Sequence, residues 1–105
     1  MGGCAVVSEE YLAKIRRAVR RGKHEEVDAE LTDIIEECRR DLIALGVLEE
    51  VANDEADPLI LGAVRCFARW KFGISNEDAA ANREDYMQLR DEIRKKAAYC
   101  TIPTA

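Results

Sequence analysis

Apolar residues recur along much of this chain at the three- and four-residue spacing of a helix. The clearest case is a stripe that ends just before Gly46: Val27, Leu31, Ile34, Ile35, Cys38, Leu42 and Leu45. Such spacing places the apolar side chains on one helical face. Acidic residues crowd the start of the segment, so we expect a long helix that buries one face and ends at Gly46.

A shorter helix is expected before it, over about Glu9 to Arg21. Ser8 can cap its N-terminus, and the acidic Glu9 and Glu10 suit the positive end of the helix dipole. Gly22 follows a basic end and is a stop signal. The buried face is predicted to carry Leu12, Ile15 and Val19.

A third helix is predicted to begin at Asp57-Pro58, because an Asx cap followed by proline at the first helical position is a favoured start. It should close at Gly73. The segment before it is expected to be an acidic loop, anchored on the core by Val47, Leu48 and Val51.

Ser75 and Asp78 resemble a capping box in which Asp replaces Glu, so a fourth helix should follow and end at about Ala98. Pro103 and the β-branched residues beside it oppose helix continuation. We therefore expect residues 99–105 to form an extended arm, mobile in the free subunit, with no strand in the same chain available to pair with it.

These patterns predict an all-α fold, a small bundle of about four helices with an extended C-terminal tail. The expected organisation is a flexible N-terminus over 1–7, a helical domain over 8–98 and the arm over 99–105. One core is predicted from ten residues of three helices: Leu31, Ile34, Ile35, Cys38, Leu42, Ile60, Val64, Phe67, Leu89 and Ile93.

Composition adds limits to this picture. The chain has 105 residues, 48% of them hydrophobic, and a net charge of −5. That is one domain by length, and no apolar run approaches the roughly 18–20 residues of a membrane span. The four cysteines include no C-x-x-C pair, so a structural zinc site is not expected. Long helical segments leave few loops for disulfides to join, so we expect reduced thiols in an intracellular protein, with Cys4 and Cys100 the more exposed; a secreted domain with two disulfides is the alternative.

Candidate catalytic chemistry is sparse. A nucleophile system would depend on His24, the single histidine, which a charged turn between helices would expose as a solvated side chain. The sequence contains no phosphate-binding glycine loop and no EF-hand pattern. We expect no enzyme activity, no metal and no cofactor, with a helical hydrolase or metal enzyme as a distant alternative.

The first helix carries the strongest charge signal. Residues 1–24 have a net charge of +4, whereas the remaining 81 residues have a net charge of −9. Such a basic segment can contact nucleic acid, can dock on acidic surface of a partner or a second copy, or can simply be solvated. The candidate contact residues are Lys14, Arg16, Arg17, Arg20 and Arg21.

Aromatic residues near the end of the third helix are the other candidate contacts. Phe67 lies on the core stripe, whereas Trp70 and Phe72 either cover the core or anchor an interface. In the arm, Tyr99 and Ile102 could add a strand to a partner's sheet edge. The alternative for the arm is an ordinary frayed terminus.

Several strings along the chain resemble the small head-tail connector proteins of tailed bacteriophages, also known as head-completion or DNA-packaging proteins. The likeness runs from about Ser8 to Ile93 and depends on the order and spacing of helices and short strings. The strings are Ser8-Glu-Glu-Tyr-Leu-Ala-Lys-Ile15, Glu30-Leu-Thr-Asp-Ile-Ile-Glu-Glu-Cys-Arg-Arg-Asp-Leu42, Asp57-Pro-Leu-Ile60, Lys71-Phe-Gly73, Asn76-Glu-Asp-Ala79 and Tyr86-x-x-Leu89.

This resemblance implies a structural, non-enzymatic role in the virion neck, after assembly in the host cytoplasm. Family members form a ring, commonly a dodecamer, that docks on the portal protein once the genome is packaged. The ring extends the channel for the packaged DNA, which it would contact without sequence specificity, and offers a platform to a tail-side stopper or neck protein. No membrane partner is expected.

Two features depart from the family pattern: the basic length of the first helix and the short tail after Tyr99. The sequence also leaves another function open. The chain could be a small helical regulator that binds DNA or protein as a dimer through its basic first helix.

Overall fold

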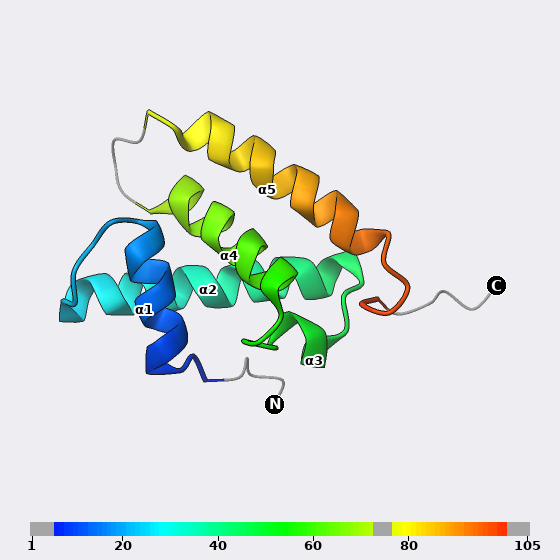
Figure 1. Cartoon of the computed structure of the whole chain (residues 1–105), viewed down its shortest axis with the longest axis horizontal. Helices are drawn as coiled ribbons and strands as arrows, with labels where there is room; N and C mark the ends of the chain where they lie inside the picture. Colours follow the sequence, from blue (N-terminus) through cyan, green and yellow to red (C-terminus); the bar gives the residue numbers. More distant parts are fainter. Residues whose placement is uncertain (1–5, 73–76, 101–105) are drawn as a thin grey trace.

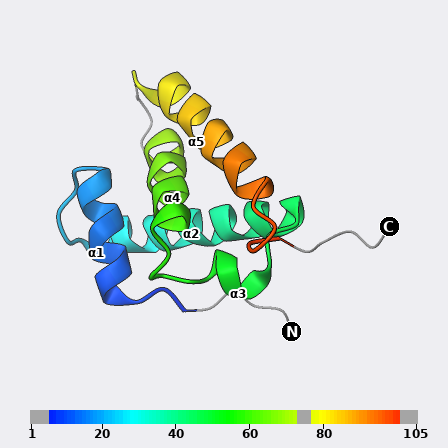
Figure 2. The ribbon, with the colours of Figure 1, turned by 45° about the vertical axis from the view of Figure 1, so that its right-hand side comes forward.

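A computed structural model describes residues 6–72 and 77–100 and confirms the all-α fold (Figure 1). The helices are α1 (Glu9–Ala18), α2 (Glu25–Leu45), α3 (Glu49–Ala52), α4 (Pro58–Lys71) and α5 (Ala79–Arg94). The long α2 lies across the molecule, α1 crosses it near one end, and α4 and α5 run side by side in opposite directions above it (Figures 1 and 2).

Local capping explains where most of these helices begin and end. The Ser8 hydroxyl accepts the Tyr11 N–H, and one Asp57 oxygen accepts the N–H groups of Leu59 and Ile60. Gly46 ends α2 with φ 122°, a left-handed conformation that favours glycine. The two predicted helix starts at Ser8 and Asp57 and the predicted end at Gly46 are confirmed.

The predicted end of α1 at Arg21 is wrong, because the chain turns earlier, at Arg20. Arg20 has φ 60°, its N–H donates to the Arg17 carbonyl, and the Arg21 N–H donates to the Arg16 carbonyl. These two bonds form a Schellman motif with arginine at the position that glycine usually occupies. Gly22 therefore lies beyond the end of α1.

The structure also corrects two other predictions, for the segment after Gly46 and for the end of the last helix. The acidic segment after Gly46 contains the short helix α3, although Val47 and Val51 do pack against the core as predicted. The helix predicted to reach Ala98 ends at Arg94. The expected capping role of Ser75 lies outside the described residues, and Asp78 occupies the cap position of α5 without a side-chain hydrogen bond to it.

The core closely matches the predicted one: nine of the ten residues are buried, and Leu89 is partly buried against them. The first helix adds Tyr11, Leu12 and Ile15, and α5 adds Tyr86. A charged residue, Arg39 of α2, is only 1% exposed. Among the described cysteines, Cys38 is buried and Cys66 and Cys100 are half-buried, all as free thiols; Cys4 lies outside the described residues.

The last described residues are held against the fold, contrary to the expected free arm. The Leu48 N–H donates to the Tyr99 carbonyl at 2.9 Å, and Val47 and Cys100 form an isolated antiparallel bridge. The Tyr99 hydroxyl donates to Asp57 Oδ2 at 2.6 Å. The backbone after α2 thus supplies the pairing partner that the sequence did not reveal, and residues 101–105 lie outside the described range.

Candidate interaction surfaces

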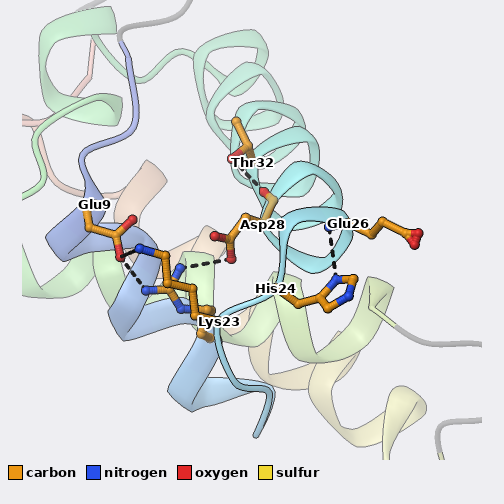
Figure 3. A network of polar contacts seen from close by, with 7 residues as sticks. Glu9, Lys23, His24, Glu26, Asp28 and Thr32 are labelled. Carbon is orange, nitrogen blue, oxygen red and sulfur yellow. Dashed lines mark hydrogen bonds and ion pairs between the residues drawn. The ribbon is translucent and has the colours of Figure 1, made fainter.

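Arg16, one of the candidate contact residues of the basic first helix, points into the subunit instead of outward. Its guanidinium donates to Glu9 at 2.5 Å and to Asp28 at 2.9 Å, and the residue is 7% exposed. Lys23 lies 4.0 Å from the same Glu9 carboxylate, and the Thr32 hydroxyl donates to the Asp28 carbonyl (Figure 3). Arg16 therefore joins α1 to the start of α2 and is not a free surface cation.

The other basic residues of this segment do lie at the surface. Arg17, Arg20 and Arg21 are exposed, and Lys14 is half-buried. The end of α1 also approaches the end of α4: Arg69 Nε donates to the Ala18 carbonyl at 3.1 Å. The basic surface at the end of α1 thus gains a cation that the sequence had not associated with it.

Phe72 lies beside this basic surface. The Arg21 guanidinium is 5.5 Å from the centre of the Phe72 ring, which is half-buried and packs against the core. Phe72 therefore contacts both the core and a surface cation, so both of the roles considered for it remain compatible with its position.

His24 is an exposed side chain, as expected, but it has a local structural role. Its Nδ1 accepts the Glu26 N–H at 3.2 Å and so caps the N-terminus of α2 (Figure 3). A histidine nitrogen that accepts in this way satisfies one of the unpaired N–H groups of the first helical turn. The contact explains the histidine at this position without a chemical function.

Trp70 lies at the centre of an aromatic cluster formed by α4 and α5. Its ring centre is 5.5 Å from that of Phe67, edge to face, and 6.2 Å from that of Tyr86. Two cations lie over its ring, Lys71 Nζ at 4.3 Å and the Arg83 guanidinium at 5.7 Å from the ring centre. Trp70 covers buried aromatic rings and also meets solvent, since it is half-buried.

An open groove of about 460 Å³ runs between α2, α4 and α5 at this cluster. We call it the α4–α5 groove. Its floor is aromatic, and Met87, one of the two large apolar side chains exposed among the described residues, lies on its wall. Its charged lining comprises the cations Arg40, Lys71, Arg83 and Arg90 and the acids Glu37 and Asp41.

Hydrogen bonds fix one wall of the groove. The Tyr86 hydroxyl donates to Asp41 Oδ2 at 2.6 Å, and Arg90 Nε donates to the same oxygen at 2.8 Å. Burial acts to raise the pKa of Asp41, but these two hydrogen bonds and the charges of Arg90 and Lys71 together outweigh it and hold the pKa below its usual value. Asp41 is therefore an anchored carboxylate at neutral pH.

Beneath this wall, Tyr86 and Cys38 form a buried contact. The Cys38 thiol lies 3.8 Å from the Tyr86 oxygen, to which it can donate. Burial raises the pKa of the Cys38 thiol to about 12 and also raises the pKa of the Tyr86 hydroxyl. Both groups stay protonated at neutral pH, so they support the groove wall and are not poised as nucleophiles.

The sequence had identified Trp70 as a candidate contact but missed the cations around it. Arg83 and Arg90 are seven residues apart on α5 and so share one helical face, which is the one signal available beforehand. Lys71 and Arg40 come from two other helices. Tyr99 is engaged with Asp57 within the subunit, and Ile102 lies outside the described residues.

Over residues 6–72 and 77–100, no group of three or more histidine, cysteine or acidic side chains could hold a metal ion. Within the same ranges, every helix is too short or too polar to cross a membrane. No family model, curated protein or solved structure matches the chain.

Proposed function

We propose that this chain is a structural subunit of the virion neck, a head-tail connector of a tailed bacteriophage. In this role it forms a ring, commonly dodecameric in the family it resembles, and docks on the portal protein after DNA packaging. The ring extends the channel through which the packaged DNA passes and offers a platform to a tail-side stopper or neck protein. It acts through its surfaces and catalyses no reaction.

One observation supports this proposal: the strings that resemble the family lie at the ends and within the helices of a small all-α subunit. Asp57-Pro58 opens α4, Lys71 closes it, and Tyr86-x-x-Leu89 lies in the middle of α5. The string Glu30–Leu42 lies within the long α2. The all-α fold is compatible with the resemblance.

The surfaces add support of a second kind. Arg17, Arg20 and Arg21 are exposed at the end of α1, and the α4–α5 groove gathers cations around an accessible tryptophan. Charged and aromatic surface on a small subunit is typical of proteins that bind other macromolecules. Exposed cations could also line a DNA channel, where contacts with phosphates need no sequence specificity.

The decisive experiment uses phage heads that are filled with DNA, carry a portal and lack a tail. The purified chain should attach to the portal vertex, appear there as a ring by electron microscopy, and allow tails to join. Heads assembled separately without a portal are the control for attachment to the portal vertex. Failure to attach to portal-bearing heads would refute the proposal, and a stable solution dimer that binds duplex DNA would favour the regulator instead.

A further inference from the structure

The α4–α5 groove has a chemical character that selects its occupant. Its floor is made by the rings of Phe67 and Tyr86, which are 4.9 Å apart and buried, and its rim is rich in cations. Such a site favours a segment that carries carboxylates beside small or apolar groups. Nucleic acid also carries negative charge, on its phosphates. A DNA duplex, however, is too large to enter a groove whose volume is about 460 Å³.

The cations of the groove differ in how far the subunit itself neutralises them. Arg90 is paired with Asp41 at 2.8 Å, and Lys71 has a looser contact with Glu37 at 3.8 Å. Arg83 has no carboxylate within ion-pair distance among the described residues and contacts the Trp70 ring. Lys71 and Arg83, which flank the indole, are therefore the cations available to a partner.

The matching acidic surface lies on the same chain, on α3. Residues 47–57 contain five acidic residues and no basic one. Three of the five already accept hydrogen bonds within the subunit: Glu55 from Ser8, Asp57 from the N-terminus of α4, and Asp54 from the Ala56 N–H. Glu49, Glu50 and Asp54 are exposed, and among the described residues no cation lies within ion-pair distance of them.

The groove and α3 lie toward opposite ends of α4. The helix α3 precedes the N-terminus of α4, whereas the groove lies at the C-terminal half of α4, and α4 has 14 residues, about 21 Å of helix (Figure 1). The two surfaces of one subunit cannot meet, but those of two identical subunits can. A contact between different surfaces of identical copies is heterologous, and it generates a closed ring when the rotation closes.

We propose that the α4–α5 groove binds the exposed acidic face of α3 from a second copy of this chain, so that copies join head to tail. The carboxylates of Glu49 and Glu50 meet Lys71 and Arg83, and the aromatic floor takes the small side chains of the acidic segment. This inference rests on the proposed function, since it names the subunit contact of the ring.

Charge exchange provides the first test. The groove variant Lys71→Glu/Arg83→Glu places acids in the groove opposite an acidic α3, and the α3 variant Glu49→Lys/Glu50→Lys places bases opposite a basic groove. Each variant alone should lose self-association by at least tenfold, measured by sedimentation and native mass spectrometry. A one-to-one mixture of the two variants should restore assemblies in which they alternate, because both kinds of contact are then attractive.

Cross-linking provides a test that does not depend on the variants folding. Wild-type isotopically heavy and light chains are mixed at high concentration and treated with a carbodiimide, which joins an amine directly to a carboxylate it touches. Heavy-light peptides that link Lys71 to Glu49 or Glu50 are expected, and about 1 M salt should reduce them, since it screens charges beyond about 3 Å. The Lys71→Arg variant keeps the charge, should still assemble, and should lose this cross-link.

The outcomes separate this inference from the proposed function. If the wild type forms rings on portal-bearing heads while Lys71 cross-links to the acidic start of α2, or to nothing in another copy, the head-to-tail contact is wrong and the connector role stands. If the variant mixture fails to assemble although each variant retains its helical circular dichroism, the contact is also wrong. Groove-dependent binding of single-stranded nucleic acid or of an unrelated acidic protein without self-association would overturn it as well.

Discussion

Glu55 binds Ser8 through both of its carboxylate oxygens, across 47 residues of sequence. Oε2 accepts the Ser8 N–H at 2.9 Å, and Oε1 accepts the Ser8 hydroxyl at 2.5 Å. The same hydroxyl accepts the Tyr11 N–H and so caps α1, while Arg39 Nη2 lies 3.5 Å from Oε2. One carboxylate therefore connects the start of α1, the buried arginine of α2 and the segment that leads into α4.

Replacing this carboxylate should destabilise the fold. We expect Glu55→Gln to lower the free energy of unfolding by about 1–3 kcal/mol, because it removes one charge partner of a buried arginine and weakens two hydrogen bonds with Ser8. Urea unfolding followed by circular dichroism measures the loss. Glu84→Gln is the matched control, since Glu84 is exposed, lies outside the proposed subunit contact and should change stability little. Equal effects of the two variants would contradict the structural role of Glu55.

Acidification should destabilise the protein through the same carboxylate. Burial acts to raise the pKa of Glu55, but the hydrogen bonds from Ser8 and the contact with Arg39 together outweigh it, so the pKa lies below the ordinary value of 4.5. The pKa values of Asp41 and Asp57 are also lowered, by hydrogen bonds and nearby cations that together outweigh the effect of burial. A group with a lowered folded-state pKa stabilises the fold above its unfolded-state pKa and loses that contribution as the pH falls through its folded-state pKa.

The free energy of unfolding should therefore be level near neutral pH and decline below about pH 4.5, the ordinary value for Glu55. Glu55→Gln removes one titrating group, so its decline should be shallower than that of the wild type. Unfolding by urea across a pH series checks both statements. Parallel curves for the two proteins would show that Glu55 titrates alike in the folded and unfolded states.

Neighbouring arginines of α1 should respond differently to truncation. Arg16 is buried between Glu9 and Asp28, whereas Arg17 is exposed. Arg16→Ala should lower the melting temperature of the free subunit, and Arg17→Ala should leave it nearly unchanged. In the proposed neck assembly, Arg17→Ala should weaken assembly more than Arg16→Ala. The exposed Arg17 can form a charge contact with a partner, whereas the buried Arg16 cannot. A free subunit indifferent to both changes would contradict the inward placement of Arg16.

Relief of backbone strain at Arg20 should stabilise the protein. A non-glycine residue in the left-handed region costs about 1–2 kcal/mol, and Arg20 has φ 60° at the Schellman position. We expect Arg20→Gly to raise the free energy of unfolding by about 1 kcal/mol. Arg20→Ala removes the same charge but keeps the strain, so it should give no such gain. Arg17→Gly, within α1, should cost about 1 kcal/mol instead.

Gly46 and Arg20 show which helix ends can be predicted from the sequence and which cannot. Helix starts at Ser8 and Asp57 and the stop at Gly46 were predictable, because each depends on a side chain or a glycine acting within a few residues. The end of α1 was not, because nothing local marks an arginine for the left-handed region. The core was predictable for a similar reason, since helical periodicity fixes which face is buried.

The interaction surfaces were harder to predict, because they depend on residues from different helices. Arg16 looked like one of several surface cations until its partner Asp28 was placed beside it from α2. Trp70 was noted in the sequence, but Lys71 and Arg83 gather around it only once α4 and α5 pack. Spacing within one helix carries no information about such contacts between helices.

The contacts of Tyr99 lead to different predictions for the two parts of the expected arm, residues 99–100 and residues 101–105. Tyr99 donates to Asp57 at 2.6 Å, and the Leu48 N–H donates to its carbonyl at 2.9 Å. Tyr99→Phe should therefore lower the free energy of unfolding by about 0.5–1.5 kcal/mol, because Asp57 loses a hydrogen bond while the ring remains. Removing residues 101–105 keeps the bonds of Tyr99 and the bridge between Val47 and Cys100, so the shortened chain should stay folded and lose less stability than Tyr99→Phe. Thermal melts of the two variants compare these losses of stability. Attachment of the truncated chain to tail-less heads tests separately whether residues 101–105 contribute to docking. A truncation that destabilises the subunit as much as Tyr99→Phe would place the stabilising contacts beyond Cys100.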